Sequence, residues 1–476
     1  MRFRFISALG AIVLVASACS SGSTASKSVA PASVAPASVA PASVAPASTI
    51  PSAAAAACTT PAAAPGSFLA RAYAGEFKGK TITGTGPFVD EDAVKFNATM
   101  KCFTEMTGIK IDYQGSKEFE ASINARVEGN DLPDIVDFPQ PGLLGNIAKT
   151  GKVIDLTTKL DQTALKANYN QSWLDMATMP GKAGDIMAGV WERVNGKSFV
   201  WYPKKAFDAA GYKVPTTAAE LTALQDQIVK DGDTPWCIGI ESGAATGWPV
   251  TDWLEEMMLR TTSLDNYDKW VTNELKFSSP EVKAAATKVG DLFLDPKLVN
   301  GGKAGIVTTA FGDAPKAMFT DPPKCWLHRQ GNFITSFFPA SAKAGVDYDV
   351  FYLPGIDPKY GNPVLVAGDI WAAFSDRPEV MAVMEYFTKG EHLKTWIESG
   401  GAIAPQKDAD LAWYKDPTTR FVAKTIVEAP SVRFDASDLM PGAVGSGAEW
   451  KEFTSWISGN KDLDTALKNI DAAWPK

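Results

Sequence analysis

Histidine is almost absent from this 476-residue chain, in which only His328 and His392 occur. The sequence also lacks a Gly-x-Ser-x-Gly elbow and a Gly-x-x-x-x-Gly-Lys-Ser/Thr loop, and Gly84-Thr85-Gly86 has no third glycine for a dinucleotide site. These absences argue against histidine-based, phosphate-loop and dinucleotide chemistry. A glycosidase needs only two carboxylates about 5 to 9.5 Å apart, so a secreted glycoside hydrolase stays open as the alternative.

Cysteine is scarce as well, and the five cysteines are Cys19, Cys58, Cys102, Cys237 and Cys325. No two of them stand two to four residues apart, so we expect no structural zinc site, no other metal and no cofactor. If Cys19 carries lipid, four thiols remain, and in an oxidising compartment they can pair in three ways. We favour Cys58–Cys102, which would tie the tail to the first long helix, and Cys237–Cys325.

The chain has no apolar run of the about 20 residues that a membrane-spanning helix needs. Residues 5–15 form a shorter apolar run behind two arginines, which is typical of a signal peptide. Ala16-Ser17-Ala18-Cys19 follows and resembles a bacterial lipobox, although Ala16 stands where that pattern prefers leucine. We therefore expect residues 1–19 to be a signal peptide with Cys19 as the lipidated residue, which places the protein on the outer face of the bacterial cytoplasmic membrane. Ordinary cleavage and secretion are the alternative.

Charge of one sign is not concentrated anywhere, since the net charge is −8 and lysine and arginine are scattered. No basic stripe for nucleic acid is present. Residues 20–75 form a low-complexity tail in which Pro31-Ala32-Ser33-Val34-Ala35 repeats with a period of five. Proline at that spacing prevents a regular helix, so the tail is expected to be a disordered spacer. Such a spacer, or a stalk for a secreted adhesin, extends roughly 3 Å per residue.

About four hundred residues follow the tail, which exceeds one core and predicts two lobes. The start of this part alternates strand and helix: residues 80–84, a helix from Asp90 to Gly108, residues 109–113, a helix over 119–127 and residues 134–138. This order predicts an α/β fold with a parallel sheet, in which ligands gather at the carboxyl ends of the strands. Further along, helices are expected at 206–210, 218–230, 379–388 and 392–399, with a strand at 236–240.

Tryptophan and acidic residues occur together in two glycine-rich segments, Glu241 to Trp248 and Gly368-Asp369-Ile370-Trp371. A pyranose stacks its C–H face on an indole, while its hydroxyl rim takes charged or amide partners. Most tryptophans pack in cores, but glycine removes bulk around the ring in these two segments. They therefore favour a carbohydrate site.

At these residues the chain resembles a known family. The segments that carry the resemblance are Gly115 to Glu120, Pro139 to Gly142, Lys197 to Pro203, Thr234 to Trp248, Pro323 to Arg329, Gly368 to Trp371 and Ser431 to Asp438. It is similar to the α-glucoside-binding lipoproteins of carbohydrate-uptake ABC transporters, which are extracellular solute-binding proteins of the maltose-binding-protein superfamily. The resemblance spans about residues 76–476.

The resemblance implies a two-lobed, type II periplasmic-binding-protein-like fold, with a multi-crossing hinge and a ligand cleft between the lobes. Lobe 1 would comprise 76–198 and 346–392, and lobe 2 would comprise 199–345 and 393–476, with the first crossing at 197–202. The protein would be a monomer and not an enzyme. It would close around an α-linked disaccharide or short oligosaccharide and deliver it to the ABC transporter permease.

Ten residues are expected to bind the ligand. Trp248, Trp326 and Trp371 are candidates to stack on sugar rings, and the candidates for hydrogen bonds are Glu118, Gln140, Glu241, Asp369 and Arg433, with Asp90 and Ser116 as weaker ones. An internal ion pair is an equal alternative for Arg433.

Overall fold

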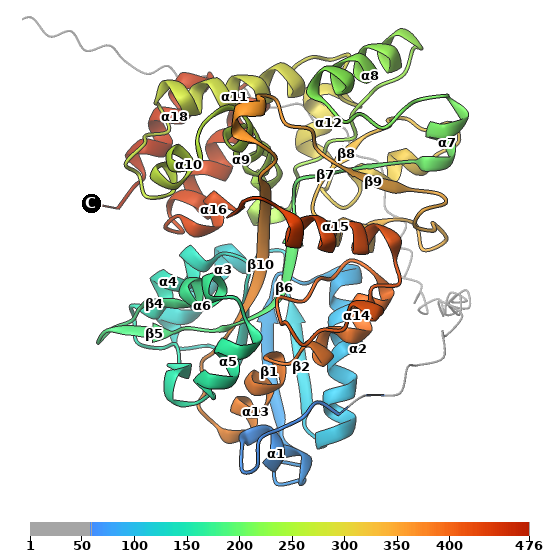
Figure 1. The fold of residues 1–476 in the computed structure, drawn as a ribbon. Coiled ribbons are helices and arrows are strands. Elements are labelled where there is room, and N and C mark those ends of the chain that lie inside the picture. Colours follow the sequence, from blue (N-terminus) through green and yellow to red (C-terminus); the bar gives the residue numbers. More distant parts are fainter. Residues whose placement is uncertain (1–57, 59, 476) are drawn as a thin grey trace, which may run out of the picture. The chain divides into compact units, whose positions relative to one another are not determined.

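The computed structural model describes Cys58 and residues 60–475 (Figure 1). The expected signal peptide, Cys19 and most of the expected spacer lie outside the described residues. No helix within the described part of the chain is long and apolar enough to cross a membrane.

The folded part begins earlier than expected. Helix α1 (Phe68–Tyr73) is capped by Ser67, whose side chain accepts a hydrogen bond from Ala70 N. Leu69 is fully buried where α1 packs against α13 (Pro378–Phe387), and its N–H donates to Glu385 Oε2 at 2.9 Å. The expected spacer boundary at residue 75 is therefore corrected, because this segment buries an apolar face against the domain.

The sheet of lobe 1 lies in the lower half of Figure 1 and has the strand order β11-β10-β3-β1-β2, with β6 pairing to β10. Its strands are β1 (Thr81–Gly86), β2 (Lys110–Gly115), β3 (Ile135–Phe138), β6 (Val190–Gly196), β10 (Val364–Ala373) and β11 (Val432–Phe434). Strand β1 runs parallel to β2 and β3, as the strand–helix alternation predicts, whereas β10 is antiparallel to β3 and β6. The carboxyl ends of β1 and β2 point toward lobe 2 (Figure 1), and β3 runs parallel to β1.

Helix α2 (Asp90–Thr107) covers this sheet and ends as expected at Gly108, which caps it in the left-handed conformation at φ 70°. Phe96, Met100 and Phe103 lie on its buried face at helical spacing. Helix α3 (Phe119–Gly129) follows β2 and also lies close to its expected range.

Lobe 2 contains a three-stranded antiparallel sheet in the order β8-β7-β9, formed by β8 (His328–Arg329), β7 (Phe199–Tyr202) and β9 (Asp349–Tyr352). Helix α9 (Trp248–Thr261) lies inside this lobe and packs against α11 (Pro280–Phe293). Residues 236–240, which were expected to be a strand, make only isolated bridges, such as those of Trp236 to Val299 and Leu327.

The other helices and strands fill out the two lobes. They are α4 (Pro141–Ala148), α5 (Gln162–Asn168), α6 (Gln171–Ala177), β4 (Thr178–Pro180), β5 (Asp185–Met187), α7 (Lys204–Ala209), α8 (Ala218–Lys230), α10 (Leu264–Val271), α12 (Gly302–Thr308), α14 (Lys394–Ser399), α15 (Pro417–Glu428), α16 (Ala436–Leu439), α17 (Trp450–Ile457) and α18 (Leu463–Ala472). Short 3-10 turns include η2 (Gly243–Ala245) and η4 (Asn332–Phe337), and residues 444–449 form a π-helical turn.

The chain crosses between the lobes several times. The first crossing, at Lys197–Ser198 between β6 and β7, lies within the expected range. Two expected boundaries shift. Strand β9 pairs with β7, so residues 346–352 belong to lobe 2 rather than to lobe 1. Helix α14 packs on α2 and buries Trp396 and Ile397 in the lobe 1 core, so the chain stays in lobe 1 beyond residue 392.

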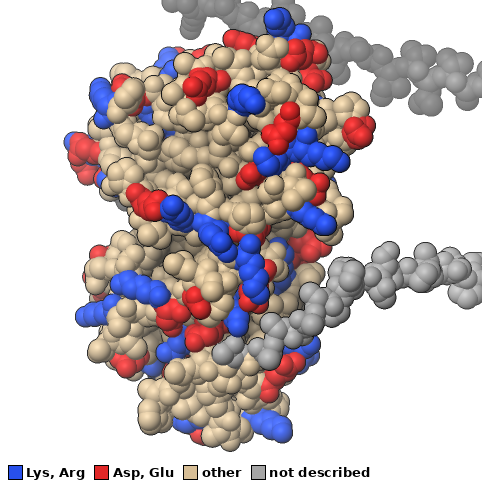
Figure 2. All heavy atoms as spheres, turned by 45° about the vertical axis from the view of Figure 1, so that its right-hand side comes forward, with Lys and Arg blue, Asp and Glu red and all other residues tan. Residues whose placement is uncertain are grey.

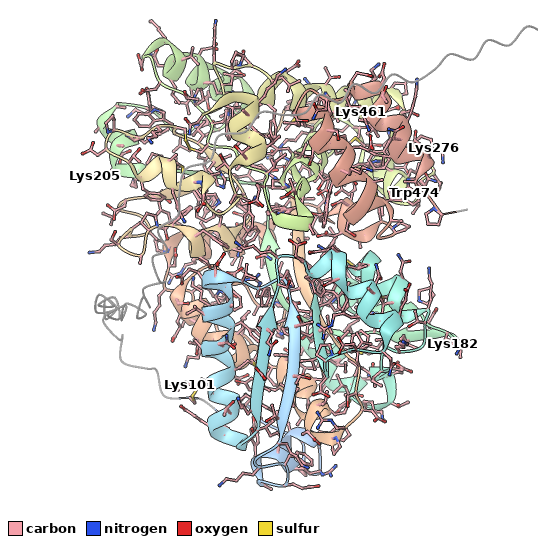
Figure 3. All side chains as sticks on the ribbon, turned by 180° about the vertical axis from the view of Figure 1, so that it is seen from behind. Lys101, Lys182, Lys205, Lys276, Lys461 and Trp474 are labelled. Carbon is pink, nitrogen blue, oxygen red and sulfur yellow. A yellow bond between two sulfur atoms is a disulfide. The ribbon has the colours of Figure 1, made fainter. Side chains whose placement is uncertain are left out.

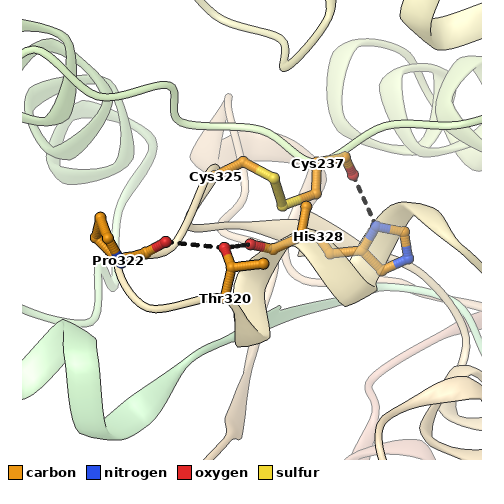
Figure 4. The surroundings of a disulfide bond; sticks show 6 residues. Cys237, Thr320, Pro322, Cys325 and His328 are labelled. Carbon is orange, nitrogen blue, oxygen red and sulfur yellow. Dashed lines mark hydrogen bonds between the residues drawn. A yellow bond between two sulfur atoms is a disulfide. The ribbon is translucent and has the colours of Figure 1, made fainter.

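Both expected disulfides are present, Cys58–Cys102 and Cys237–Cys325. The second lies in lobe 2 beside His328, whose Nδ1 is 2.7 Å from Cys237 O (Figure 4). Burial lowers the pKa of His328 to about 4, so this imidazole is neutral at pH 7 and donates to the carbonyl.

The surface carries both signs of charge on each lobe, with a short basic run where the lobes meet (Figure 2). Other lysines are scattered over both lobes. Figure 3 labels Lys101 and Lys182 on lobe 1, and Lys205, Lys276 and Lys461 on lobe 2.

Candidate functional site

Lys197 occupies the first crossing and is buried between the two lobes. Its N–H donates to Leu365 O at 2.8 Å, which fixes it to β10. Its ammonium donates to Asp252 Oδ1 of α9 at 2.7 Å and to Asp435 Oδ2, between β11 and α16, at 2.6 Å. Burial opposes the charge, but these carboxylates outweigh it and raise the pKa of Lys197.

The pKa values of the carboxyl groups around Lys197 are shifted in opposite directions. Burial opposes ionisation of Asp435, yet Lys197 and the hydrogen bond from Ser437 Oγ lower its pKa to about 2. Burial and the charge of Asp435 raise the pKa of Glu255 well above its usual value. Oxygens of Asp252, Glu255 and Asp435 lie within 4.8 Å of one another, the spacing of a metal site. The Lys197 ammonium already bridges two of them, so it supplies the positive charge that a metal ion would bring.

Arg193, on β6, is the second buried cation of this region. Its Nε donates to Asp369 Oδ2 at 2.6 Å and its Nη2 donates to Asp92 Oδ2 at 3.2 Å. The guanidinium carbon lies 4.4 Å from the ring centroid of Phe88 and 4.3 Å from that of Trp396. Two carboxylates and two aromatic faces therefore hold the guanidinium in one orientation. Its Nη1 is buried without a partner among the described residues.

Several acceptors on the lobe 1 side also lack partners among the described residues. Both carboxylate oxygens of Asp137, at the end of β3, are buried without a hydrogen bond, and so are Asp92 Oδ1 and Gln140 Oε1. Burial, together with the charge of Asp369, raises the pKa of Asp137. Burial raises the pKa of Glu120 to about 7, and Gln140 Nε2 lies 3.3 Å from Glu120 Oε1. Buried polar atoms are normally paired, so these acceptors are candidates to receive hydrogen bonds from a ligand.

Lobe 2 contributes an aromatic side to the same region. Trp248, at the start of α9, is only partly buried. Its ring centroid lies 5.1 Å from that of Phe311 and 6.0 Å from that of Phe333, and Lys197 Nζ lies 5.3 Å from it. We call the region formed by the surroundings of Lys197, Arg193, Asp137 and Trp248 the interlobe site.

The two lobes touch directly beside this site. Glu241 Oε1 accepts a hydrogen bond from Gly243 N at 2.8 Å, which shapes the turn before α9. Gly243 has φ 57°, and a side chain there would approach Glu118 Oε1, across the lobe boundary, to 3.0 Å. Glycine is therefore required at this contact both for its backbone conformation and for space.

Seven of the ten predicted ligand-binding residues lie around the interlobe site. They are Asp90, Ser116, Glu118, Gln140, Glu241, Trp248 and Asp369. At its rim Asp90 pairs with Lys117 at 3.3 Å, and Ser116 Oγ accepts a hydrogen bond from Glu118 N at 3.1 Å.

The other three lie elsewhere. Trp371 is 0% exposed in the lobe 1 core, stacked on Phe96 at 5.0 Å and 13°, so it offers no face to a ligand. Trp326 packs edge-on against Tyr212 inside lobe 2. Arg433 makes a two-pronged ion pair with Asp268, at 2.6 and 2.9 Å, which matches the alternative of an internal ion pair. We leave these three out of the proposed site.

Arg193, Lys197, Asp92 and Asp137 were missed by the sequence reasoning, although a signal was present. Residues 190–202 read as a strand of apolar and aromatic residues interrupted by charges, and buried charges in such a context are rarely incidental. The same holds for α9, in which Asp252, Glu255 and Glu256 are fully buried.

The comparisons with known proteins agree with this architecture. Residues 85–391 match the family model of the bacterial extracellular solute-binding proteins. The chain belongs to this family. Two relatives align with this chain over more than four fifths of its length. The osmoprotective compounds-binding protein GgtB of Synechocystis sp. is 42% identical over 397 residues, which cover 83% of this chain and 93% of the relative. The alpha-glucosides-binding periplasmic protein AglE of Rhizobium meliloti is 38% identical over 404 residues, covering 84% and 88%.

Two solved structures show the same fold. The bacterial solute receptor AcbH aligns with a TM-score of 0.68 at 18% identity, over 83% of this chain and 98% of that one. The maltose-bound MalE3 of T. maritima aligns with a TM-score of 0.64 at 16% identity, over 82% and 98%. The predicted two-lobed, maltose-binding-protein-like fold is confirmed. The protein is an extracellular solute-binding protein of the ABC transporter class, and its matching family is one of binding proteins.

Proposed function

We propose that the protein binds an α-glucoside or a similar short oligosaccharide at the interlobe site and delivers it to an ABC importer by hinge closure. The observation that carries this proposal is the 38% identity to AglE, an alpha-glucosides-binding protein, over 84% of this chain. The permease would receive the loaded, closed form.

The geometry of the interlobe site supports a sugar ligand. Trp248 offers a partly exposed indole for the apolar face of a pyranose. Asp137, Gln140 and Asp369 lie on the opposite lobe with carboxylate and amide groups for its hydroxyl rim. Glu118 and Glu241 approach each other at the rim, with Asp90 and Ser116 nearby. Closure would bring the two sets of groups onto one ligand.

The proposed location is the outer face of the cytoplasmic membrane, where an acylated Cys19 would anchor a monomer through the Pro/Ala/Ser/Val spacer. Release of the protein from membranes by detergent but not by salt, and its loss from membranes in Cys19→Ala, would test the anchor.

A second ligand class has its own support, because GgtB binds osmoprotective compounds by its name and is 42% identical to this chain. Sucrose and trehalose are α-glucosides as well as osmoprotectants, so their binding fits both classes. Short maltodextrins represent the first class alone, and glycine betaine, an osmoprotectant without a glucosyl group, represents the second alone.

The decisive experiment is a thermal-shift screen of the purified protein with maltose, maltotriose, trehalose and sucrose, followed by calorimetry. We expect one site with a dissociation constant of about 1 μM or below, near −8 kcal/mol. Trp248→Ala should weaken binding at least tenfold, whereas Trp326→Phe, a change inside lobe 2, should leave the affinity unchanged. Binding of none of these sugars would contradict the proposal, and turnover of nitrophenyl α-glucosides would favour the hydrolase.

A further inference from the structure

Resting on the proposed function, we infer that the interlobe site excludes carboxylated ligands and selects neutral, hydroxyl-rich ones. The basis is an imbalance between the cations and the acceptors that line it. Every described cationic side chain of the site is already held by protein acceptors, while several carboxylate oxygens are not satisfied.

Three cationic side chains of the site are paired with protein carboxylates. Arg193 and Lys197 are each held by two carboxylates, as described above. At the rim, Lys117 pairs with Asp90 at 3.3 Å. Arg193 keeps only Nη1 unpaired, so a ligand carboxylate could gain one hydrogen bond there. A two-pronged ion pair would have to displace Asp92 or Asp369, and the displaced carboxylate would stay buried and unpaired.

Lys95 is the remaining cation beside the site and has no carboxylate contact. It donates instead to Ser336 Oγ and to Gly400 O, both at 3.0 Å, which link α2 to η4. Burial lowers the pKa of Lys95. Two of its three N–H donors are already engaged by protein oxygens, so it offers a ligand carboxylate one donor at most.

Several hydrogen-bond acceptors of the site, in contrast to its cations, have no partner among the described residues. Both oxygens of Asp137, one of Asp92 and the amide oxygen of Gln140 are buried without a donor among the described residues. The unpaired donors described on this side are Nη1 of Arg193 and Nε1 of Trp396, whose ring stacks on that guanidinium, so unpaired acceptors outnumber unpaired donors there. A buried acceptor without a donor is costly, and a ligand that brings several hydroxyl groups supplies the missing donors.

A ligand carboxylate brings acceptors only and adds negative charge beside Asp92 and Asp369, two carboxylates that share the single guanidinium of Arg193. Repulsion between like charges in a buried site exceeds its value in water several-fold, because the effective dielectric constant is lower. Discrimination then comes from rejection of the charged ligand as well as from attraction of the neutral one.

The test uses two matched ligand pairs that differ by one carboxylate: maltitol against maltobionate, and methyl α-glucoside against methyl α-glucuronide. In each pair whose neutral member binds, we expect the carboxylate to bind at least tenfold more weakly by calorimetry at pH 7.5. Equal affinity within such a pair overturns the inference and leaves the proposed function intact. If neither neutral member binds and maltose also fails, the proposed function is what fails.

Two further measurements identify the cause. Asp369→Asn removes one charge and releases a donor edge of Arg193, so it should narrow the gap between maltitol and maltobionate at least threefold. Asp268→Asn releases Arg433 on the surface of lobe 2 and is the matched control, with no change in the gap. In the unmodified protein, raising NaCl from about 20 to about 500 mM should strengthen maltobionate binding and not maltitol binding, because salt screens repulsion. If the difference in affinity between maltitol and maltobionate changed neither in Asp369→Asn nor with salt, an electrostatic origin would be contradicted.

Discussion

Arg193 and Lys197 are two buried cations four residues apart, and each is held by two carboxylates, yet they hold different parts of the molecule together. The partners of Arg193 are Asp92 and Asp369, both of lobe 1. The partners of Lys197 belong to lobe 2 and to the segment after β11, so its ammonium joins a crossing strand to elements far away in sequence.

The two side chains suit these tasks. The planar guanidinium stacks between two aromatic rings and keeps one donor unpaired, which makes it a preformed part of a binding surface. The compact ammonium of Lys197 lies between carboxylates and fastens the crossing. We therefore expect Lys197 to govern stability and Arg193 to shape the ligand-facing surface.

The largest expected effect comes from breaking the Lys197 arrangement. Lys197→Met leaves the buried Asp435 without its cation and leaves Asp252 with Arg329 alone, at 3.5 Å. Removal of one partner from a buried ion pair costs about 3–5 kcal/mol. Urea unfolding at pH 7.5 measures this loss. Lys204→Met removes a partly exposed lysine that pairs with Asp208 one turn further along α7, and it should cost less than about 1 kcal/mol. A loss of similar size in both variants would contradict the role given to Lys197.

Glu120 sharpens the comparison, because it is a partly buried carboxyl group that no described salt bridge joins to a cation. Burial raises its pKa from 4.5 to about 7. The folded protein therefore holds this proton more tightly than the unfolded chain, and the stability it contributes below pH 4.5 is lost as the pH rises through 7. Gln does not titrate, so Glu120→Gln removes that loss. The free energy of unfolding of the variant, relative to that of the unmodified protein, should therefore rise by about 2 kcal/mol between pH 5 and pH 8 in urea unfolding.

An exposed carboxylate supplies the control of opposite sign. Hydrogen bonds from Thr216 lower the pKa of Glu220. Glu220→Gln should therefore lose stability relative to the unmodified protein above pH 4.5, and the difference should vanish in acid. A pH slope of the same sign for both variants would show that Glu120 does not titrate as inferred.

Much of the fold was predictable from the sequence, and the site only in part. The alternation of strands and helices over residues 80–138 predicts the parallel part of the sheet, because periodicity and capping are local. Trp248 and Trp371 stand in similar glycine-rich segments, yet only the first lies at the interlobe site. The difference arises from pairing: β10 runs through the middle of the sheet, so Trp371 faces α2 and is buried there. Such partners are set by the tertiary fold and leave no trace in the neighbouring sequence.

Arg433 closes the comparison as a third cation, held by one carboxylate at the surface. Its side chain is 30% exposed and that of Asp268 is 53% exposed, so water screens the pair and its strength is about 0–1 kcal/mol. Arg433→Ala should therefore change the free energy of unfolding by less than about 1 kcal/mol and leave the sugar affinity unchanged in calorimetry. The pair ties β11 to α10 rather than facing the interlobe site, which is the physical reason for both expectations. If Arg433→Ala abolished sugar binding while the fold persisted, Arg433 would have to reach the ligand in the closed state, and the assignment of this side chain to the surface would be wrong.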